Sequence, residues 1–547
     1  MKKLFAISLL FVFSSVLFAQ ETLEQSMDAY MSHMYGDEGP GATILVAKNG
    51  KPIYRKAFGL ANLEVQSQMS PENVFELGSI TKQFTSVSIL MLEEQGKLSL
   101  DDEITKYIPD YPTHDKKITI HHLLNHTSGI KSYTGMQSFM ELARQDMIPE
   151  ELIDVFKNEP MDFDPGDKFL YNNSGYILLG YIIENLSGMT YEEFVEKNIF
   201  EKLGMSNSYY GKMKQIIPNR ASGYQVDEDS YQNAEYLSLT LPYAAGSLMS
   251  TVDDLLKWQN AINANELIKR SSLEKAINGS RLNNGEEISY GYGWVKGNLK
   301  GSPIVSHGGG IFGFTTNEIY FPEEDIYVVG LSNCNCKDIG DAATKIGAMA
   351  IGKSFPNVKD EISLSPEQLK KWVSAYQYEN AVRHITMKEG KLYSQREGST
   401  NLPIFALSEN HFIFEGGTTE YHFSADDTGK RNVVMNTMDG TSKGIEIDKD
   451  APKERVEINV DPITMKKYVG QYEIQPEFIL TITYRDGSLY AQGTNQPEFP
   501  LFAESESTFF LKVVPASIDF KLDEMGEAES LILHQGGASM PAKKLED

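Results

Sequence analysis

A serine and a lysine stand three residues apart, at Ser79 and Lys82, where a segment with helical periodicity begins. The apolar residues Ile80, Phe84 and Val87 fall on one face of that predicted helix. Residues three apart on a helix project from the same side. A serine hydroxyl becomes a nucleophile when a base takes its proton, and a lysine amine can be that base when burial lowers its pKa. The pair therefore predicts nucleophilic catalysis, with N–H groups at the helix start facing the negative charge that develops.

Two further segments carry side chains that suit the same chemistry. Tyr171 lies between an Asp-Pro-Gly turn at 164–166 and an apolar helical segment at 176–183, so we expect it in a loop facing a cleft. Its phenolate would accept a proton if nearby cations lowered its pKa. His307 ends a predicted strand, and the glycines at 308–310 permit a ligand to approach the backbone closely. The imidazole offers a hydrogen-bond donor or, when protonated, a cation.

Two other patterns are interpreted as structure. Ser272 and Lys275 repeat the Ser-x-x-Lys spacing, but their segment has the charge pattern of an ordinary helix surface. His122 and His126 are four residues apart, as in a zinc-binding helix, yet no glutamate follows the first histidine as the metalloprotease motif requires. We therefore predict no metal site and no cofactor.

Taken in chain order, the segments at 79–82, 171–173 and 307–309 resemble the three motifs of one superfamily of serine hydrolases. It contains class C β-lactamases, penicillin-binding proteins such as D-alanyl-D-alanine carboxypeptidases, esterases and D-aminopeptidases. The segments 118–129, 245–251 and 290–294 support the resemblance, which covers about residues 25–350. It implies an α/β (α+β) fold, in which helices flank an antiparallel sheet.

The resemblance also implies roles for individual residues. It implies Ser79, Lys82, Tyr171 and His307 as catalytic residues, and Asn173, Gly309 and Gly310 as substrate-binding or oxyanion residues. Ser79 would attack a carbonyl, Lys82 and Tyr171 would relay its proton, and water would later release the acyl group. The N–H groups of Ser79 and Gly310 would form the oxyanion hole, and Asn173 would orient the substrate amide.

One position departs from the β-lactamase branch. Those enzymes commonly carry Lys-Thr-Gly where this chain has His307-Gly308-Gly309, a form typical of the esterase and peptidase branches. A lysine there holds a substrate carboxylate, whereas a histidine does so only when protonated. An esterase or peptidase is therefore favoured over an efficient β-lactamase.

The chain ends indicate export and a modular organisation. Residues 1–19 combine two lysines, an apolar run from Leu4 to Leu17 and a small residue at Ala19, which together indicate a cleaved signal peptide. The apolar run is shorter than the roughly 18 to 20 residues of a spanning helix. Cleavage removes two lysines from a chain of net charge −26 and leaves −28, in a periplasmic or secreted protein. So acidic a protein should not bind nucleic acid or anionic lipid.

The domain pattern follows from strand and helix signals. Strand patterns at 42–59 and 303–333 flank a helical region, so we expect one catalytic domain at 20–352 whose terminal strands share a sheet. Beyond it, residues 391–395 recur as 488–492 at an offset of 97. Short alternating segments in both copies predict two small all-β, barrel-like domains, closed barrels or sandwiches, at 366–450 and 462–547, which are also candidate oligomerisation surfaces. The two cysteines, Cys334 and Cys336, are too close in sequence to staple a fold, and we predict free thiols.

Two functions from different classes fit these observations. The first is an exported serine hydrolase that forms an acyl-enzyme on Ser79 and cleaves a small ester, an amide or a short peptide containing a D-amino acid. The alternative is a catalytically slow sensor that binds penicillin or peptidoglycan fragments. Both take a small molecule or short peptide as partner.

Overall fold

The computed structural model describes residues 22–545, apart from gaps at 228–229, 380, 398, 438–439, 453–456, 476–477, 486, 495–497, 513, 515, 524–525 and 536–537. The predicted signal peptide at 1–19 lies outside the described residues. The chain divides into two compact units, residues 1–355 and 356–547. Among the described helices, none has both the length and the apolar character needed to cross a membrane.

A six-stranded antiparallel sheet forms the centre of the first unit. Its strands, in spatial order, are β12 (Val295–Leu299), β13 (Ser302–Ile311), β14 (Phe314–Phe321), β15 (Ile326–Ser332), β1 (Ala42–Lys48) and β2 (Lys51–Phe58). Strand β1 pairs with β2 on one side and with β15 on the other, where Ala42 faces Ser332. The prediction that strands from both ends of this unit share one sheet is confirmed. Asn49 and Gly50 both take left-handed φ angles, of 52° and 69°, which fit the tight turn between β1 and β2.

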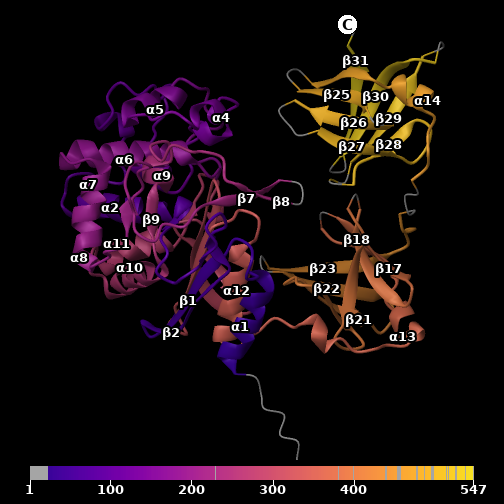
Figure 1. Cartoon of the computed structure of the whole chain (residues 1–547), viewed down its shortest axis with the longest axis horizontal. Helices are drawn as coiled ribbons and strands as arrows, with labels where there is room; N and C mark the ends of the chain where they lie inside the picture. Colours follow the sequence, from indigo (N-terminus) through magenta and orange to yellow (C-terminus); the bar gives the residue numbers. More distant parts are fainter. Residues whose placement is uncertain are drawn as a thin grey trace, which may run out of the picture. The chain divides into compact units, whose positions relative to one another are not determined.

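Helices cover both faces of this sheet because its strands are apolar on both sides. Leu45 of β1 packs into a large core with α2, α6 and α10, whereas Ile44 and Val46 point to the opposite face. That opposite face is covered by α1 and α12, which lie on the other side of β1 from the other labelled helices of this unit (Figure 1). The helices are α1 (Leu23–Met34), α2 (Thr81–Glu94), α3 (Ile120–Leu124), α4 (Phe139–Leu142), α5 (Pro149–Phe156), α6 (Asn173–Ser187), α7 (Tyr191–Val195), α8 (Glu201–Leu203), α9 (Tyr243–Gly246), α10 (Val252–Ala264), α11 (Arg270–Ile277) and α12 (Ile339–Ala350).

Helix α2 is enclosed on every side. Every residue from Thr81 to Leu92 is buried, so the helix is not amphipathic in the way that the sequence pattern suggested. Phe84 stacks on Trp258 of α10 at a ring-centroid distance of 4.0 Å. Such a helix can hold a polar side chain in a fixed position away from water, which matters for Lys82.

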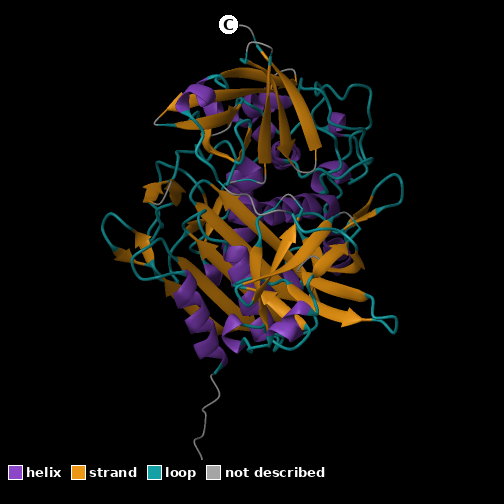
Figure 2. Cartoon of the chain, turned by 90° about the vertical axis from the view of Figure 1, so that its right-hand side faces the viewer, coloured by secondary structure: helices purple, strands orange, loops and turns teal. Residues whose placement is uncertain are grey.

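The second unit consists of two closed eight-stranded antiparallel barrels, as the internal repeat predicted. The first contains β16 (Ser374–Gln377), β17 (Val382–Lys388), β18 (Lys391–Arg396), β19 (Leu402–Ala406), β20 (His411–Phe414), β21 (Glu420–Ala425), β22 (Arg431–Thr437) and β23 (Gly440–Ile447). The second contains β24 (Gly470–Gln475), β25 (Phe478–Arg485), β26 (Ser488–Gly493), β27 (Glu498–Ala503), β28 (Thr508–Phe510), β29 (Ala516–Leu522), β30 (Ala528–Gln535) and β31 (Ala538–Lys544). Figure 2 shows strands curving around the barrel that carries the C-terminus.

The repeat extends to side-chain contacts. A short helix precedes each barrel, α13 (Pro366–Lys370) and α14 (Pro462–Lys466). In the first barrel the Tyr376 hydroxyl donates to the carbonyl of Trp372 at 2.9 Å, and in the second the Tyr472 hydroxyl donates to the carbonyl of Tyr468 at 2.8 Å. Closing the sheet into a barrel removes the exposed edges that short strands would otherwise present.

The prediction of free thiols is wrong. Cys334 and Cys336 form a disulfide, with their Cα atoms 5.1 Å apart. That separation lies in the ordinary range for disulfides, roughly 4.4 to 6.8 Å, because the loop after β15 curls back over a single residue. The bond shapes this loop locally and does not join distant parts of the chain.

Candidate active site

Ser79 lies in a 3-10 turn (Gly78–Ile80) that leads directly into α2. Gly78 has a left-handed φ of 54°, and a Cβ there would meet the backbone oxygen of Gly310 at 2.9 Å. The turn is fixed to β14 because the Thr316 hydroxyl donates to the carbonyl of Leu77 at 2.8 Å. The serine is therefore held directly against the end of β13.

Lys82 is completely buried one turn further along α2. Its Nζ atom donates to Ser79 Oγ at 3.1 Å, to Asn173 Oδ1 at 2.8 Å and to the carbonyl of Ala245 at 2.9 Å. All three partners are uncharged, so they do not compensate a positive charge. Burial consequently lowers the pKa of Lys82 well below its usual value. A neutral amine has a free lone pair, and the Ser79 hydroxyl can turn to donate to it.

Tyr171 lies in the loop before α6 and faces this amine. The loop is fixed because Asn172 caps α6 through Gly175 N–H at 2.8 Å and donates its own N–H to His126 Nδ1 at 3.1 Å. Lys82 Nζ lies 4.8 Å from the centroid of the Tyr171 ring.

The expectation that the pKa of Tyr171 is lowered, which would give a phenolate, is wrong. Although 36% of the residue is exposed, burial of its polar end raises the pKa of Tyr171, and contacts with Ser79 and Tyr290 only partly oppose this. The neighbouring amine does not lower the pKa because Lys82 itself favours the neutral form. Tyr171 is therefore a phenol at neutral pH.

His307 is buried in β13, with 5% of its surface exposed. Its Nδ1 lies 2.6 Å from the carbonyl of Gly308, and its Nε2 lies 2.9 Å from the hydroxyl of Tyr290. A carbonyl only accepts, so Nδ1 carries the proton and Nε2 accepts from Tyr290. Burial is the largest cause that lowers the pKa of His307, to about 4. The imidazole is neutral at neutral pH, and the cationic role considered from the sequence does not apply there.

Of the glycines that follow His307, Gly309 is required by the packing of β13 on the serine turn. A Cβ at Gly309 would lie 2.0 Å from the carbonyl oxygen of Leu77 and 2.3 Å from the Thr316 hydroxyl. Gly310 borders the cavity beside Ser79. Its amide nitrogen is 3.0 Å from where a Cβ of Gly78 would stand, so the backbones of β13 and the serine turn are in contact.

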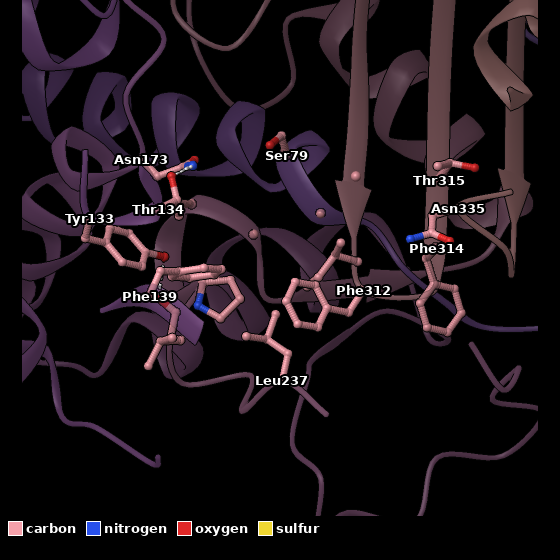
Figure 3. A pocket seen from close by; sticks show the side chains of 17 residues that line it. Ser79, Tyr133, Thr134, Phe139, Asn173, Leu237, Phe312, Phe314, Thr315 and Asn335 are labelled. Atoms are coloured by element: carbon pink, nitrogen blue, oxygen red, sulfur yellow. Dashed lines mark hydrogen bonds between the residues drawn. The ribbon is translucent and has the colours of Figure 1, made fainter. Parts of the chain in front are cut away.

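A cavity of about 420 Å³ opens in front of Ser79. Its polar lining comprises Ser79, Thr134, Asn173, Thr315 and Asn335, and its apolar lining includes Tyr133, Phe139, Leu237, Leu241, Ile311, Phe312 and Phe314. Figure 3 shows Phe139, Leu237 and Phe312 together on the side away from Asn173, whose side-chain amide donates to the Thr134 hydroxyl at 3.0 Å. Among the described residues that line the cavity, none carries a charge.

The structure thus brings the predicted residues Ser79, Lys82, Tyr171, Asn173 and Gly310 to one place, with His307 in contact through Tyr290. The direct partner of His307, Tyr290, had been noted only as part of a supporting segment. His126, which the sequence placed in a structural segment, packs against Tyr171 with ring centroids 4.3 Å apart.

The Ser-x-x-Lys pair at Ser272 and Lys275 is structural. The Ser272 hydroxyl donates to Glu94, and the Lys275 amine donates to Glu93 from a side chain that is 52% exposed. The spacing alone does not distinguish the two pairs, whereas burial of the lysine does, because Lys82 is enclosed and Lys275 is exposed.

The helix-flanked antiparallel sheet and the buried Ser-x-x-Lys pair beside a tyrosine define a serine hydrolase of the penicillin-recognising type. Residues 21–347 match the Beta-lactamase family, and the chain belongs to it. Residues 454–546, which contain the second barrel, match a domain of unknown function, DUF3471.

Individual relatives agree with this assignment. A curated penicillin-binding protein of Bacillus subtilis (strain 168) is 29% identical over 419 residues, which are 72% of this chain and 92% of the relative. The octameric penicillin-binding protein homologue from Pyrococcus abyssi is similar over 77% of this chain and 99% of its own, with 28% identity and a TM-score of 0.54. The D-amino acid amidase from Ochrobactrum anthropi SV3 shares the fold, with a TM-score of 0.55 over 60% of this chain and 99% of its own at 22% identity.

Proposed function

We propose that this serine hydrolase forms an acyl-enzyme on Ser79, with Lys82 as the base that activates it. The observation that carries the proposal is the position of Lys82, which is fully buried among uncharged partners with Nζ 3.1 Å from Ser79 Oγ. An amine whose pKa is lowered by burial can take the hydroxyl proton at neutral pH.

The proposed acylation begins with a proton transfer and a nucleophilic attack. The Ser79 proton moves to Lys82 Nζ while Oγ bonds to the substrate carbonyl carbon, and the carbonyl electron pair moves onto its oxygen. The N–H groups of Ser79 and Gly310 stabilise that oxyanion. When the bond to the leaving group breaks, the Tyr171 phenol protonates the leaving group and regains a proton from Lys82. Water then attacks the acyl ester by the reverse path and frees Ser79.

Three other side chains position these groups. Asn173 contacts Lys82 through Oδ1 and borders the cavity, where its amide orients a substrate carbonyl or amide. Neutral His307 accepts from the Tyr290 hydroxyl, and the Tyr290 ring packs on Tyr171 with centroids 5.9 Å apart. We assign His307 this positioning role in place of carboxylate binding, because its pKa of about 4 leaves it uncharged.

The substrate we propose is a small ester, an amide or a short peptide with a D-amino acid, and its acyl side is neutral and apolar. The cavity beside Ser79 presents aromatic and aliphatic side chains, and its described lining holds no cation to pair with a carboxylate. Relatives named as penicillin-binding proteins and a D-amino acid amidase support this class. Efficient hydrolysis of carboxylate-bearing β-lactams is not expected.

We further propose export to the periplasm or beyond the cell. The support is the signal-peptide pattern of residues 1–19, and N-terminal sequencing of protein recovered outside the cytoplasm should begin at Gln20. A protein starting at Met1 would contradict cleavage. The barrels remain candidate surfaces for oligomer formation, in line with the octameric relative.

The decisive experiment is covalent labelling. A fluorophosphonate probe should label the wild-type protein at Ser79, and Ser79→Ala should abolish both labelling and turnover of p-nitrophenyl esters and D-aminoacyl anilides. Ser272→Ala is the matched control, because it removes the serine of a Ser-x-x-Lys pair outside the site and should leave both unchanged. Full labelling of Ser79→Ala would rule out this nucleophile. A product burst without turnover in wild type would instead identify the slow sensor.

A further inference from the structure

Three side chains with metal-binding atoms gather on the outer face of the first barrel. In the ladder between β20 and β21, His411 faces His422 and Ile413 faces Glu420. The alternating residues Phe412 and Tyr421 are fully buried in the barrel core. Because side chains alternate across a strand, His411, Glu420 and His422 all lie on the opposite, outer face. We call these three residues the His–Glu–His cluster; Figure 1 labels β21, which carries two of them.

The cluster is compact. His411 Nε2 lies 2.8 Å and His422 Nε2 lies 3.7 Å from Glu420 Oε2, and all three ligand atoms lie within 4.8 Å of one another. Two ligand atoms that bind one tetrahedral ion at about 2.1 Å each are separated by about 3.4 Å. The two Nε2–Oε2 separations, 2.8 Å and 3.7 Å, lie on either side of that value. The imidazole rings are stacked, with centroids 4.1 Å apart, and both Nε2 atoms lie near the same carboxylate.

We infer that the His–Glu–His cluster binds a divalent transition-metal ion of the Zn²⁺ type. Two imidazole nitrogens and one carboxylate oxygen are a ligand set that such ions prefer, and three protein ligands leave a fourth position for water or another ligand. Solvent reaches the cluster because the His422 side chain is 42% exposed, while Glu420 is only 13% exposed. The net charge of −26 favours the approach of cations.

The barrel fold does not itself require these side chains. At the repeat offset of 97, the second barrel places Thr508, Ser517 and Asp519 where the first has His411, Glu420 and His422. The ladder is the same, since Thr508 faces Asp519 and Phe510 faces Ser517. An equivalent barrel thus forms with a threonine, a serine and one carboxylate on this face. The cluster is a property of the first barrel alone.

The ladder already brings His411 Nε2 to within 2.8 Å of Glu420 Oε2, so ligand atoms from both strands face one small space. The bound ion would join β20 to β21 at the barrel surface and stabilise the first barrel against unfolding.

The test compares Zn²⁺ binding by the full chain and by a variant that carries the second barrel's residues. Wild type, first treated with a chelator and dialysed, should take up one saturable equivalent of Zn²⁺ by calorimetry and melt at a higher temperature with it. The variant His411→Thr, Glu420→Ser, His422→Asp should lose that equivalent and the shift in melting temperature. Its residues are those an equivalent barrel already accommodates, so the fold should persist, which circular dichroism checks.

Two controls address other sources of binding. His534→Gln removes the histidine of the His534–Asp519 pair in the second barrel, separated by 3.1 Å, and should keep the equivalent and the shift. The single variants His411→Gln and His422→Gln should each weaken Zn²⁺ binding by about 10-fold or more, and they cover the case in which the triple variant does not fold. The inference is overturned if the variants bind Zn²⁺ as wild type does, if wild type binds none, or if Mg²⁺ at equal concentration gives the same shift.

Discussion

Lys82 and Tyr171 have opposite pKa shifts, and together these define the pH dependence of the proposed reaction. Burial disfavours the charged form of each group, which is the ammonium of Lys82 and the phenolate of Tyr171. The amine is thereby available as a base at a lower pH than usual, and the phenol remains an acid to a higher pH than usual. A base and an acid with their pKa values arranged in this order can both be in the required form across a wide neutral range.

We expect kcat/KM to rise with pH through neutral toward mildly alkaline values and then to reach a plateau. The rise follows deprotonation of Lys82, so its midpoint should lie well below the ordinary lysine pKa of about 10.4. His307, with a pKa of about 4, is neutral throughout and contributes no step between pH 6 and 9. The measurement is a pH–rate profile with an uncharged ester.

Tyr171→Phe serves as the control for this assignment. It removes the phenol that protonates the leaving group, so the plateau should fall by roughly 10² to 10⁴-fold while the midpoint of the rise stays near that of wild type. A profile that peaks in acid and falls by pH 8 with the fold intact would contradict Lys82 as the base.

At the scale of single residues, the sequence predicted which residues form the site better than it predicted their protonation states. Ser79 and Lys82 are close because a helix joins them, and that proximity is local information. The neutrality of His307 depends mainly on its burial in the folded protein, which spacing does not encode. The His–Glu–His cluster was missed for a related reason, since its members meet across a ladder without a recognised motif spacing.

The elements behind the site are joined by a chain of buried polar side chains. Trp258 Nε1 of α10 donates to Gln83 Oε1 of α2 at 2.9 Å, and the Gln83 amide donates to Glu318 of β14. The hydroxyl of Tyr327 in β15 donates to the same carboxylate at 2.7 Å. Gln83 is the neighbour of Lys82, so this chain connects the sheet to the helix that carries the proposed base.

Glu318 should make the stability of the fold depend on pH. Burial raises the pKa of Glu318 to about 7, above its usual value of 4.5. A raised pKa in the folded state means that the protonated form is preferred there. The stabilising effect is complete below about pH 4.5 and is lost as pH rises through 7. At pH 8 the cost of ionising Glu318 in the fold is on the order of 3 kcal/mol.

The variant Glu318→Gln tests this dependence because an amide, like a protonated carboxyl, has one acceptor oxygen and a donor. Denaturant unfolding should show that the variant gains stability relative to wild type between pH 5 and pH 8, by up to about 3 kcal/mol. Comparing the two proteins at each pH removes the contribution of every other titrating group. A difference that is constant with pH would show that Glu318 is ionised in the fold across this range.

Element positions followed from the sequence where the pattern was periodic. The shared sheet of β1 and β15 and the two barrels were predicted from alternation and from the repeat. Helix α2 was expected to be amphipathic because Ile80, Phe84 and Val87 align on one face. It is enclosed because α6, α7 and α9 pack on its polar sides, which only the tertiary arrangement determines. The disulfide at 334–336 also escaped prediction, since it depends on the curl of one loop.

On the scale of the whole molecule, the candidate active site belongs to a single unit. Both hydrophobic cores that flank the six-stranded sheet consist of residues from 27 to 355. All the site residues, from Ser79 to Gly310, and the described cavity lining also fall in residues 1–355. A unit with its own core and its own site is expected to fold without the rest of the chain.

A protein that starts at Gln20 and ends at Phe355 should therefore unfold cooperatively and label with a fluorophosphonate probe, as the full-length protein does. Labelling stoichiometry and thermal unfolding are the measurements, and Ser79→Ala in the shortened protein is the control for specific labelling. Retained labelling with altered KM for larger substrates would indicate that the barrels restrict access. A shortened protein that aggregates or fails to label would contradict this expectation and show that the catalytic unit needs the barrels, although every site residue lies before residue 356.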